Sequence, residues 1–515
     1  MKFLLDFFLS SRKGLCAFLF LGVLLVVLTR MPQWTSPHLD LDGDEAILGL
    51  MAKHVYEGKA FPLFFYGQNY GLSFIETLAA ASFFFCFGVS TISLKASMLF
   101  LWCLGWIFFV LALDIFSNRK YAFFLSLFLI FCPAWNLWSM MARGGYITAF
   151  ALFSLCLWML GLVYRKKGNA LFLGLCLGFS MGLLLLAQPL FFLAILPWTF
   201  LLFSQKFFFY ANALASFSSI FVLVYFLSHS NSPFWSPQVL SVQESWNSLL
   251  SLRENLWAFF SGIYYLGDIE ADRGFSTIIA SSIWCIFAAS VIFSMLYFFL
   301  KHKIFFLLYA PFFSYFGIIV ISLFLFPFGC RYLLPLPCVM LLFFSQALVL
   351  WESHQKKSVL IAVLLLVLFS GAGACWEARQ YSRSWNLTWN SPYTKAKEVL
   401  VQSLLENQIY YVYCMHPLFQ WNLIWDSQEK IIARYNHARD RYPVYPKMVD
   451  DAFFNNQKVA IVGRDFQLET IVLFAHQMGV KSIPMKILPG GYFWISPVDI
   501  RLLKRLGFQL WEKKQ

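Results

Sequence analysis

Long apolar runs, interrupted by short polar segments, fill most of the chain up to residue 377. About 20 consecutive apolar residues are needed for a helix to cross the hydrocarbon core of a membrane, and a helix pairs its own backbone groups there. The pattern therefore predicts an all-α polytopic membrane region with about 11 transmembrane helices. The predicted spans are 15–31, 94–116, 121–140, 146–164, 170–187, 189–203, 207–228, 276–300, 304–327, 331–351 and 358–377.

Beyond residue 377 the charge density rises and the apolar runs shorten to the length of strands. We therefore predict two domains, a transmembrane domain over 1–377 and a small α/β domain over 378–515. The second prediction depends on strands at Ile409–Cys414 and Val459–Val462, a helix at Leu468–Met478 ended by Gly479, and a hairpin of Ile483–Leu488 and Tyr492–Ser496 around Pro489-Gly490-Gly491.

One apolar run, Gly71–Gly88, decides the topology. If it crosses the membrane, the basic clusters Arg119-Lys120 and Arg165–Lys167 fall on the side opposite the basic N-terminus. If it is an interfacial helix (71–88), the basic clusters share the cytoplasmic side, as the positive-inside rule requires. Glu76 favours the interfacial helix, because a carboxylate can stay in water there. The runs 170–187 and 189–203 have an alternative interpretation as a short or kinked hairpin.

The preferred topology predicts an integral plasma (inner) membrane protein with a cytoplasmic N-terminus. The first apolar run is expected to be retained, because Thr29-Arg30-Met31-Pro32 offers no small-residue signal-peptide cleavage site. The outer face then carries an acidic loop over 32–70, a long loop over 229–275 and the C-terminal domain, which makes that domain extracytoplasmic.

Composition supports a membrane protein and argues against other classes. Charged residues make up 13% of the chain, about half of the roughly 25% typical of a soluble domain. The net charge of +13 comes from short clusters between apolar runs, which indicates membrane anchoring rather than nucleic-acid binding. Most of the 11 cysteines lie in apolar runs, and no CxxC pair or His/Cys cluster is present, so neither a disulfide framework nor a zinc site is predicted.

The segment Leu39–Glu45 is the strongest candidate for chemistry, because it sets several carboxylates at a membrane surface. Asp44 is the candidate general base, with Glu45 beside it, since a positioned carboxylate can remove a proton from an acceptor hydroxyl. The alternative is that Asp44 caps a helix over Glu45–Glu57, and the two roles are compatible. Paired oxygens also suit Mg²⁺ or Mn²⁺, although the sequence gives no complete set of ligands.

Two further groups on the predicted outer face suit a sugar or a phosphate. Gln68, Asn69 and Tyr70 follow a glycine in Tyr66–Gly71 and offer amide and aromatic groups, although an interfacial aromatic belt explains the tyrosines equally well. A guanidinium group can bind two phosphate oxygens at once. Alternatively, it can anchor the end of a span by snorkelling to the membrane surface, or pair with neighbouring acids. The candidates for phosphate binding are Arg143, Arg273 and the pair Arg331 and Tyr332.

These motifs resemble the GT-C superfamily of membrane glycosyltransferases, in the branch of the protein O-mannosyltransferases and lipid A aminoarabinose transferases. The resemblance is specific around 40–76, with Gly43–Ala46 and Tyr66–Gly71, and at Arg331-Tyr332-Leu333-Leu334-Pro335-Leu336. It implies that Asp44 is the catalytic base and that the donor is a sugar on a polyprenyl phosphate. Two departures leave the donor sugar open: a loop lysine is replaced around Gln68-Asn69, and Arg143–Tyr146 has no acidic residue.

The sequence thus predicts an inverting glycosyltransferase that moves a hexosyl or pentosyl group from a polyprenyl-phosphate carrier to an acceptor hydroxyl. The expected partners are this donor, membrane lipids, and a glycan, lipid or protein acceptor. A transporter or flippase of lipid-linked sugars is the main alternative, but transporters carry ionisable residues near the membrane midplane, and here they gather on one face. A polymerase or ligase of lipid-linked glycans shares the same features.

Overall fold

The computed structural model describes the first membrane helices, most of the first loop and most of the C-terminal domain. The predicted spans 207–228 and 358–377 lie outside the described residues. Of the spans 276–300 and 304–327, only residues 286, 289 and 315–317 are described. The described residues are 11–34, 39, 41–68, 71–196, 198–199, 241–252, 255–256, 259, 286, 289, 315–317, 330–352, 391–437, 440–479 and 483–511.

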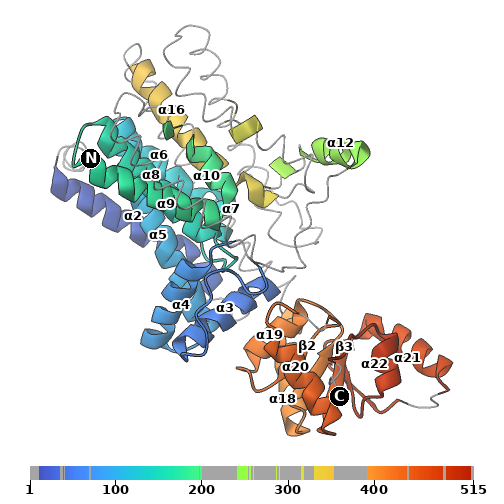
Figure 1. The fold of residues 1–515 in the computed structure, drawn as a ribbon. Coiled ribbons are helices and arrows are strands. Elements are labelled where there is room, and N and C mark those ends of the chain that lie inside the picture. Colours follow the sequence, from blue (N-terminus) through green and yellow to red (C-terminus); the bar gives the residue numbers. More distant parts are fainter. Residues whose placement is uncertain are drawn as a thin grey trace.

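Three described helices are long and apolar enough to cross a membrane, and each matches a predicted span. They are α2 (Arg12–Trp34), α5 (Thr91–Phe116) and α8 (Tyr146–Tyr164). Helix α5 packs along α8, which in turn packs against α9 (Ala170–Ala187), and these helices form one bundle (Figure 1). The region is therefore an integral multi-pass membrane domain, while the total of about 11 spans and their orientation remain predictions.

The remaining described helices of this region are shorter. Helix α10 follows α9 after Gln188 alone, whose extended backbone (φ −153°) redirects the chain, so the predicted runs 170–187 and 189–203 are joined without a loop. The other elements are α3 (Gly43–Tyr56), α4 (Phe74–Phe87), α6 (Arg119–Phe131), α7 (Pro133–Trp138), α10 (Pro189–Ile195), α12 (Val242–Leu250), the 3₁₀ turn η4 (Cys330–Leu333) and α16 (Leu336–Glu352).

The predicted span 121–140 is not continuous, because the helix breaks between α6 and α7 at Cys132 and Pro133. Proline lacks the backbone N–H that would bond the preceding turn, so carbonyl groups lose their partners at this point. Arg30 of α2, which is fully buried, donates to the carbonyl oxygens of Ile130 at 2.7 Å and Trp135 at 3.3 Å. A charge from another helix therefore stabilises the break.

Glu76 contradicts one expectation about the segment 71–88. Its helix, α4, has 14 residues and is about 21 Å long, short of the roughly 30 Å needed to cross. However, Glu76 is 0% exposed, so the prediction that it stays in water is wrong. Its carboxylate accepts hydrogen bonds from the backbone N–H groups of Gly145, Ile147 and Thr148 at 3.0–3.2 Å.

Burial of Glu76 follows from the start of α8. The N-cap residue of α8 is Gly145, which has no side chain to bond the unpaired N–H groups of the first turn. The carboxylate of Glu76 takes this role from a neighbouring helix, and its negative charge is favourable at a helix N-terminus. Glu76 thereby ties α4 to α8.

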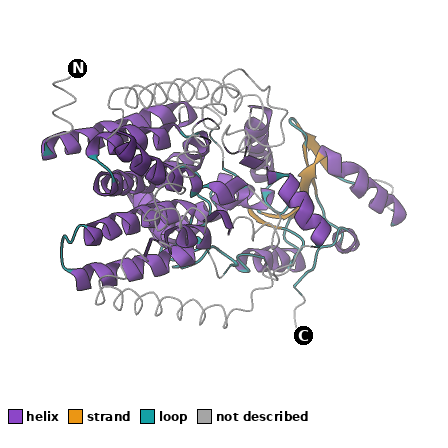
Figure 2. Ribbon diagram, turned by 90° about the horizontal axis from the view of Figure 1, so that it is seen from above, coloured by secondary structure: helices purple, strands orange, loops and turns teal. Residues whose placement is uncertain are grey.

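The C-terminal domain is a mixed five-stranded sheet with helices, as predicted, and its strands gather at one side of the molecule (Figure 2). The order is β2-β1-β3-β5-β4, in which β1 runs parallel to β2 and β3, and β5 runs antiparallel to β3 and β4. The elements are α18 (Ser391–Glu406), β1 (Tyr411–Cys414), α19 (Phe419–Asp426), β2 (Ile432–Arg434), α20 (Val444–Phe454), β3 (Val459–Arg464), α21 (Leu468–Gln477), β4 (Met485–Leu488), β5 (Tyr492–Ile495) and α22 (Ile500–Arg505).

Four predicted strands and the predicted helix match β1, β3, β4, β5 and α21, and Gly479 ends α21 with a φ of +73°. The sequence did not reveal β2, which is only three residues long. A buried ion pair of Arg434 and Asp450 fixes β2 against α20, and Tyr413 of β1 donates to the same carboxylate at 2.9 Å.

We predict that Glu76→Ala lowers the stability of the membrane domain by about 2–4 kcal/mol, because buried N–H groups at the start of α8 lose their acceptor. Thermal unfolding in detergent, followed by tryptophan fluorescence, measures the effect. Glu398→Ala, at an exposed position of α18, is the matched control. An unfolding temperature for Glu76→Ala equal to that of the control would contradict the capping role of Glu76.

Candidate functional site

Helix α3 begins in the acidic segment, and its cap differs from the alternative considered for Asp44. The N-cap is Asp42, whose side chain accepts from the backbone N–H of Glu45 at 2.9 Å. Glu45 in turn accepts from the backbone N–H of Asp42 at 3.2 Å. The two residues form a capping box. The proposal that Asp44 caps this helix is therefore wrong, and its carboxylate is left for another role.

Glu45 is held deep in the membrane domain. It is 2% exposed and forms an ion pair with Lys95 of α5, which is 3% exposed. The same carboxylate oxygen accepts the backbone N–H of Ala142 at 3.1 Å. With the bond to Asp42, both carboxylate oxygens of Glu45 have partners, so Glu45 anchors α3 to α5 and to the turn before α8.

Arg143 is committed to the same segment. Its guanidinium forms an ion pair with the free oxygen of the Asp42 carboxylate, with Nε at 2.7 Å, and lies over the ring of Trp138. Burial alone would lower the pKa of Arg143, but the Asp42 carboxylate more than offsets this effect and raises it. Arg143 therefore stays charged and holds the first loop against the turn before α8.

Asp44 differs from its neighbours. Its side chain is 37% exposed, and its nearest charged partner is Arg441 of the C-terminal domain, with Nη1 at 3.5 Å from Oδ1. This oxygen accepts no hydrogen bond from any residue that the structure describes. Asp42 and Glu45 have their carboxylates occupied. Asp44 instead combines a partly exposed side chain with a buried oxygen, Oδ1, that accepts no hydrogen bond from a described residue.

The C-terminal domain packs directly on α3, and small residues permit the approach. A Cβ atom on Gly43 would lie 2.7 Å from Cβ of Leu418, and one on Gly67 would lie 2.6 Å from Cα of Arg441. Gly67 also has a φ of +69°, which suits glycine. Asn422 of α19 donates to the carbonyl oxygen of Leu41 at 2.6 Å. The start of α3 is thus enclosed between two domains.

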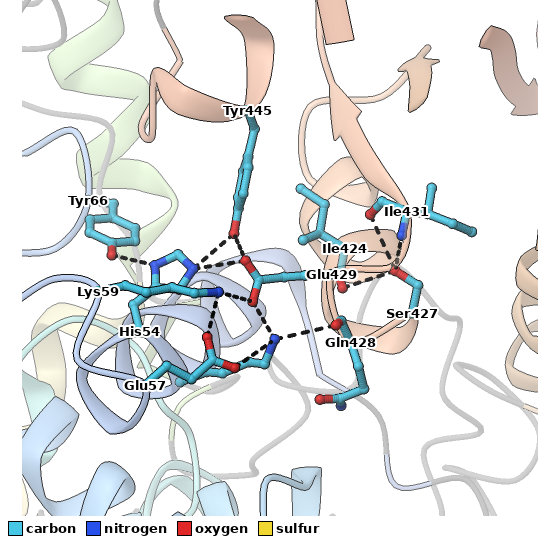
Figure 3. Close-up of polar contacts among 11 residues, drawn as sticks. His54, Glu57, Lys59, Tyr66, Ile424, Ser427, Gln428, Glu429, Ile431 and Tyr445 are labelled. Atoms are coloured by element: carbon cyan, nitrogen blue, oxygen red, sulfur yellow. Dashed lines mark hydrogen bonds and ion pairs between the residues drawn. The ribbon is translucent and has the colours of Figure 1, made fainter. Parts of the chain in front are cut away.

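A polar cluster joins the other end of α3 to the C-terminal domain (Figure 3). His54 lies between the hydroxyl of Tyr66, 2.7 Å from Nδ1, and the carboxylate of Glu429, 3.0 Å from Nε2. Glu429 also accepts from Tyr445 at 2.9 Å and forms an ion pair with Lys53. We refer to these five residues as the joint cluster.

The joint cluster stabilises an ionised carboxylate. Burial alone would raise the pKa of Glu429, but hydrogen bonds from His54, Lys53 and Tyr445 together lower it well below its ordinary value. Burial raises the pKa of Tyr66 and of Tyr445, with the negative charge of Glu429 adding to the effect. The tyrosines therefore remain hydrogen-bond donors, and Glu429 remains charged at neutral pH.

The other predicted site residues have separate positions. Gln68 lies in a turn where its backbone N–H donates to Phe65 at 2.9 Å. Arg331 lies in η4, exposed, with its guanidinium over the ring of Tyr332. The residues that lie outside the described part of the chain are Asn69, Tyr70 and Arg273. The described residues contain no group of three or more His, Cys, Asp or Glu arranged to hold a metal ion.

Sequence reasoning missed the residues that fix α3 from a distance. Arg441, Glu429 and Tyr445 belong to the C-terminal domain, and no local pattern marks them. Lys95 carried a signal that could have been used, because it is a lone lysine at the start of an apolar run. A buried lysine requires a buried carboxylate as its partner, and Glu45 supplies it.

The geometry defines a class of protein: a polytopic membrane protein whose first loop is enclosed by an α/β C-terminal domain. No protein-family profile matches the chain, and no curated protein sequence is similar to it. Solved structures are similar. ArnT from Cupriavidus metallidurans bound to undecaprenyl phosphate superimposes with a TM-score of 0.62 and 11% identity, over 96% of this chain and 99% of that chain.

A second similar structure is the oligosaccharyltransferase of Archaeoglobus fulgidus in complex with zinc and sulfate. Its TM-score is 0.52 with 14% identity, over 89% of this chain and 69% of that chain. Both are membrane glycosyltransferases of the GT-C type. The chain therefore has the GT-C fold, which confirms the resemblance drawn from its motifs.

We predict that Glu429→Gln lowers the stability of the joint between the domains by about 2 kcal/mol at pH 7, because hydrogen bonds to a charged acceptor are lost. The pKa of Glu429 is depressed in the folded state, so its contribution is present above about pH 4.3, the ordinary glutamate value. It is lost as the pH falls below that value. Below about pH 4.3, the unfolding temperature of the wild type should therefore fall more steeply with decreasing pH than that of the variant.

Glu406→Gln is the matched control, since Glu406 is exposed on α18 and its contact is with Gln402. Its pH profile should follow that of the wild type. Parallel profiles for Glu429→Gln and the wild type across the acidic range would show that the ionised carboxylate of Glu429 does not hold the domains together.

Proposed function

We propose that the protein is an inverting glycosyltransferase that moves a sugar from a polyprenyl-phosphate carrier to an acceptor hydroxyl at the outer face of the membrane. The proposal is supported by the GT-C fold, which extends over nearly the whole length of a structure that holds undecaprenyl phosphate. It is carried by one observation about the first loop. Asp44 has a partly exposed side chain whose Oδ1 accepts no hydrogen bond from a described residue, whereas the carboxylates of Asp42 and Glu45 are bound to partners.

Asp44 is the general base of the proposed reaction. Its carboxylate removes the proton from the acceptor hydroxyl, and the hydroxyl oxygen attacks the anomeric carbon on the face opposite the phosphate. The bond from that carbon to the phosphate oxygen breaks, and polyprenyl phosphate leaves with the bonding electrons. Attack from the opposite face inverts the configuration. A positioned base of this kind contributes about 10²–10⁴-fold to the rate.

Glu45 and Arg143 are assigned positioning roles in this proposal. Each is bound in the anchoring network of α3, to Lys95 and Asp42 respectively, so they hold the loop and keep Asp44 aimed. Arg331 is the proposed partner of the departing phosphate, because a guanidinium can stabilise the charge that develops there. The proposed contacts to the donor also include Gln68, Asn69, Tyr70, Arg273 and Tyr332.

The described residues do not fit a divalent metal site at Asp44. Mg²⁺ takes about six oxygen ligands in near-octahedral geometry. The carboxylates of Asp42 and Glu45 are engaged with Arg143 and Lys95, which leaves Asp44 as a single carboxylate in the described part of the loop. The proposed reaction therefore assigns proton removal to Asp44 and phosphate stabilisation to arginine, with no step that depends on a metal.

We predict that Asp44→Asn lowers sugar transfer by about 10²–10⁴-fold, because the amide has the same shape but cannot accept the proton. The purified protein is incubated in lipid nanodiscs with radiolabelled undecaprenyl-phosphate-linked hexoses or pentoses and a membrane lipid and glycan extract. Transferred label and released undecaprenyl phosphate are both counted.

Asp451→Asn is the matched control, since Asp451 lies on α20 and outside the proposed site. It should transfer sugar at the wild-type rate, and both variants should unfold at the wild-type temperature. Undiminished transfer by Asp44→Asn would refute the role of Asp44. Movement of an intact lipid-linked sugar across the membrane, without its cleavage, would identify a transporter instead.

A further inference from the structure

A pocket of about 420 Å³ lies between the first loop and the C-terminal domain, with residues of both in its lining. The loop side is formed by Leu41, Asp42 and Gly43, directly before Asp44, and the C-terminal side includes His416 and Arg464. Its volume falls within the roughly 300–1,000 Å³ of pockets that bind small molecules. Of the predicted donor-binding residues that the structure describes, namely Gln68, Arg143, Arg331 and Tyr332, none lines the pocket.

The topology of the sheet explains why a pocket forms here. The chain passes from β1 to β2 on one side and then to β3 on the other side of β1. In an open sheet with parallel strands, such a reversal opens a crevice outside the carboxyl ends of the two strands, where ligands bind. His416 follows β1 by two residues, and Arg464 is the last residue of β3. The pocket therefore occupies the switch point of the C-terminal sheet.

The lining carries positive charge. Arg464 and Lys397 both line the pocket, and Lys397 is paired with Asp426, 3.6 Å away. The guanidinium of Arg464 lies over the ring of Tyr492, 5.0 Å from its centre. The carboxylate of Asp42, which also lines the pocket, is neutralised by Arg143. A ligand with a carboxylate or phosphate group would meet a favourable field at this position.

His416 adds a hydrogen-bond donor whose direction is fixed by the backbone around it. Its Nδ1 accepts the backbone N–H groups of Leu418 and Phe419 at 3.2 and 3.3 Å, so in the neutral ring the proton is on Nε2. Burial lowers the pKa of His416, and the charge of Arg464 lowers it further, which keeps the ring neutral at pH 7. A neutral ring with Nε2–H can donate to a hydroxyl or carboxylate oxygen.

Aromatic surface completes the lining. The rings of Phe419 and Tyr492 are stacked, with centres 5.1 Å apart and planes inclined by 19°, and both residues line the pocket. Aromatic side chains supply apolar surface, and tyrosine adds a polar tip. This combination suits a ligand with both C–H faces and hydroxyl groups, which is the chemistry of a sugar ring.

We propose that this pocket binds the acceptor of the transfer, and that the acceptor is an acidic saccharide, a sugar that carries a carboxylate or a phosphate group. The inference rests on the proposed function and specifies its acceptor. Arg464 binds the acidic group, and the aromatic pair and His416 bind the ring. The pocket opens beside Asp44, the residue that would deprotonate a hydroxyl. Arg464 is the specificity-determining residue.

Binding is tested in the full-length Asp44→Asn protein in nanodiscs of uncharged lipid, so that no transfer accompanies it. The carboxylate probe is trigalacturonic acid, compared with its neutral methyl ester, and the phosphate probe is glucose 6-phosphate, compared with glucose. Calorimetric titration should show at least a 10-fold preference for one acidic probe over its neutral counterpart. That preference should shrink as salt is raised, because screening weakens charge interactions.

Arg464→Gln should weaken binding of the preferred acidic probe at least 10-fold and leave the neutral probe unchanged, with Arg464→Lys between the two. Arg501→Gln, which removes an exposed arginine of α22 outside the pocket, should bind like the parent protein. His416→Gln is a second variant that keeps the charge of Arg464. It should weaken binding of the acidic probe and of its neutral counterpart about 3-fold or more. Equal binding of acidic and neutral probes, or unchanged binding by Arg464→Gln, would overturn the proposal.

Transfer assays separate this inference from the proposed function. Transfer by the wild type together with an unchanged acceptor KM in Arg464→Gln would overturn the acceptor pocket and leave the glycosyltransferase standing. If no lipid-linked donor supports transfer but the acidic probe still binds selectively, the proposed enzyme activity and the acceptor role of the pocket are both overturned. The pocket then remains a binding site for acidic saccharides. A raised acceptor KM with an unchanged kcat in Arg464→Gln supports both the glycosyltransferase activity and the acceptor pocket.

Discussion

Helix α3 is restrained by charges at both ends, and the geometry of the proposed site depends on this restraint. At its start, Asp42 and Glu45 are paired with Arg143 and Lys95, and near its end Lys53 is paired with a carboxylate of the C-terminal domain. Both side chains of the Glu45–Lys95 pair are buried, and removing one partner from a buried ion pair typically costs about 3–5 kcal/mol. The backbone around Asp44 is therefore fixed, although the Asp44 side chain itself is partly exposed.

The described carboxylates of the acidic segment differ in their contacts. Those of Asp42 and Glu45 bind partners and position the loop, and that of Asp44, which is partly exposed, is the one to which we assign proton removal. Such an arrangement explains why several acids stand together in a chain with little charge elsewhere. A catalytic carboxylate on an unsupported loop would lose most of the advantage of position, because misplacement by about 1 Å can reduce a rate 100-fold.

Features set by local sequence could be predicted well. The span 146–164 matches α8 at both ends, and Pro489-Gly490-Gly491 joins β4 to β5 as expected, because apolar length and turn glycines act over a few residues. Features that depend on contacts between distant residues could not be predicted. The burial of Glu76 depends on N–H groups about 70 residues away, and the break before Pro133 is stabilised by Arg30 from another helix. The sequence singled out Asp44 as a candidate, but it gave no sign of Arg441, which lies beside it.

The first loop and the surface that encloses it lie far apart in the sequence. Asn422 and Glu429 bind Leu41 and His54 across 381 and 375 residues. A nascent chain that has been made only as far as its membrane helices therefore holds the acidic loop without the surfaces that steady it. Under the proposed chemistry, a chain still in synthesis does not transfer lipid-linked sugars until the residues around Asn422 and Glu429 have been made and have folded against the loop.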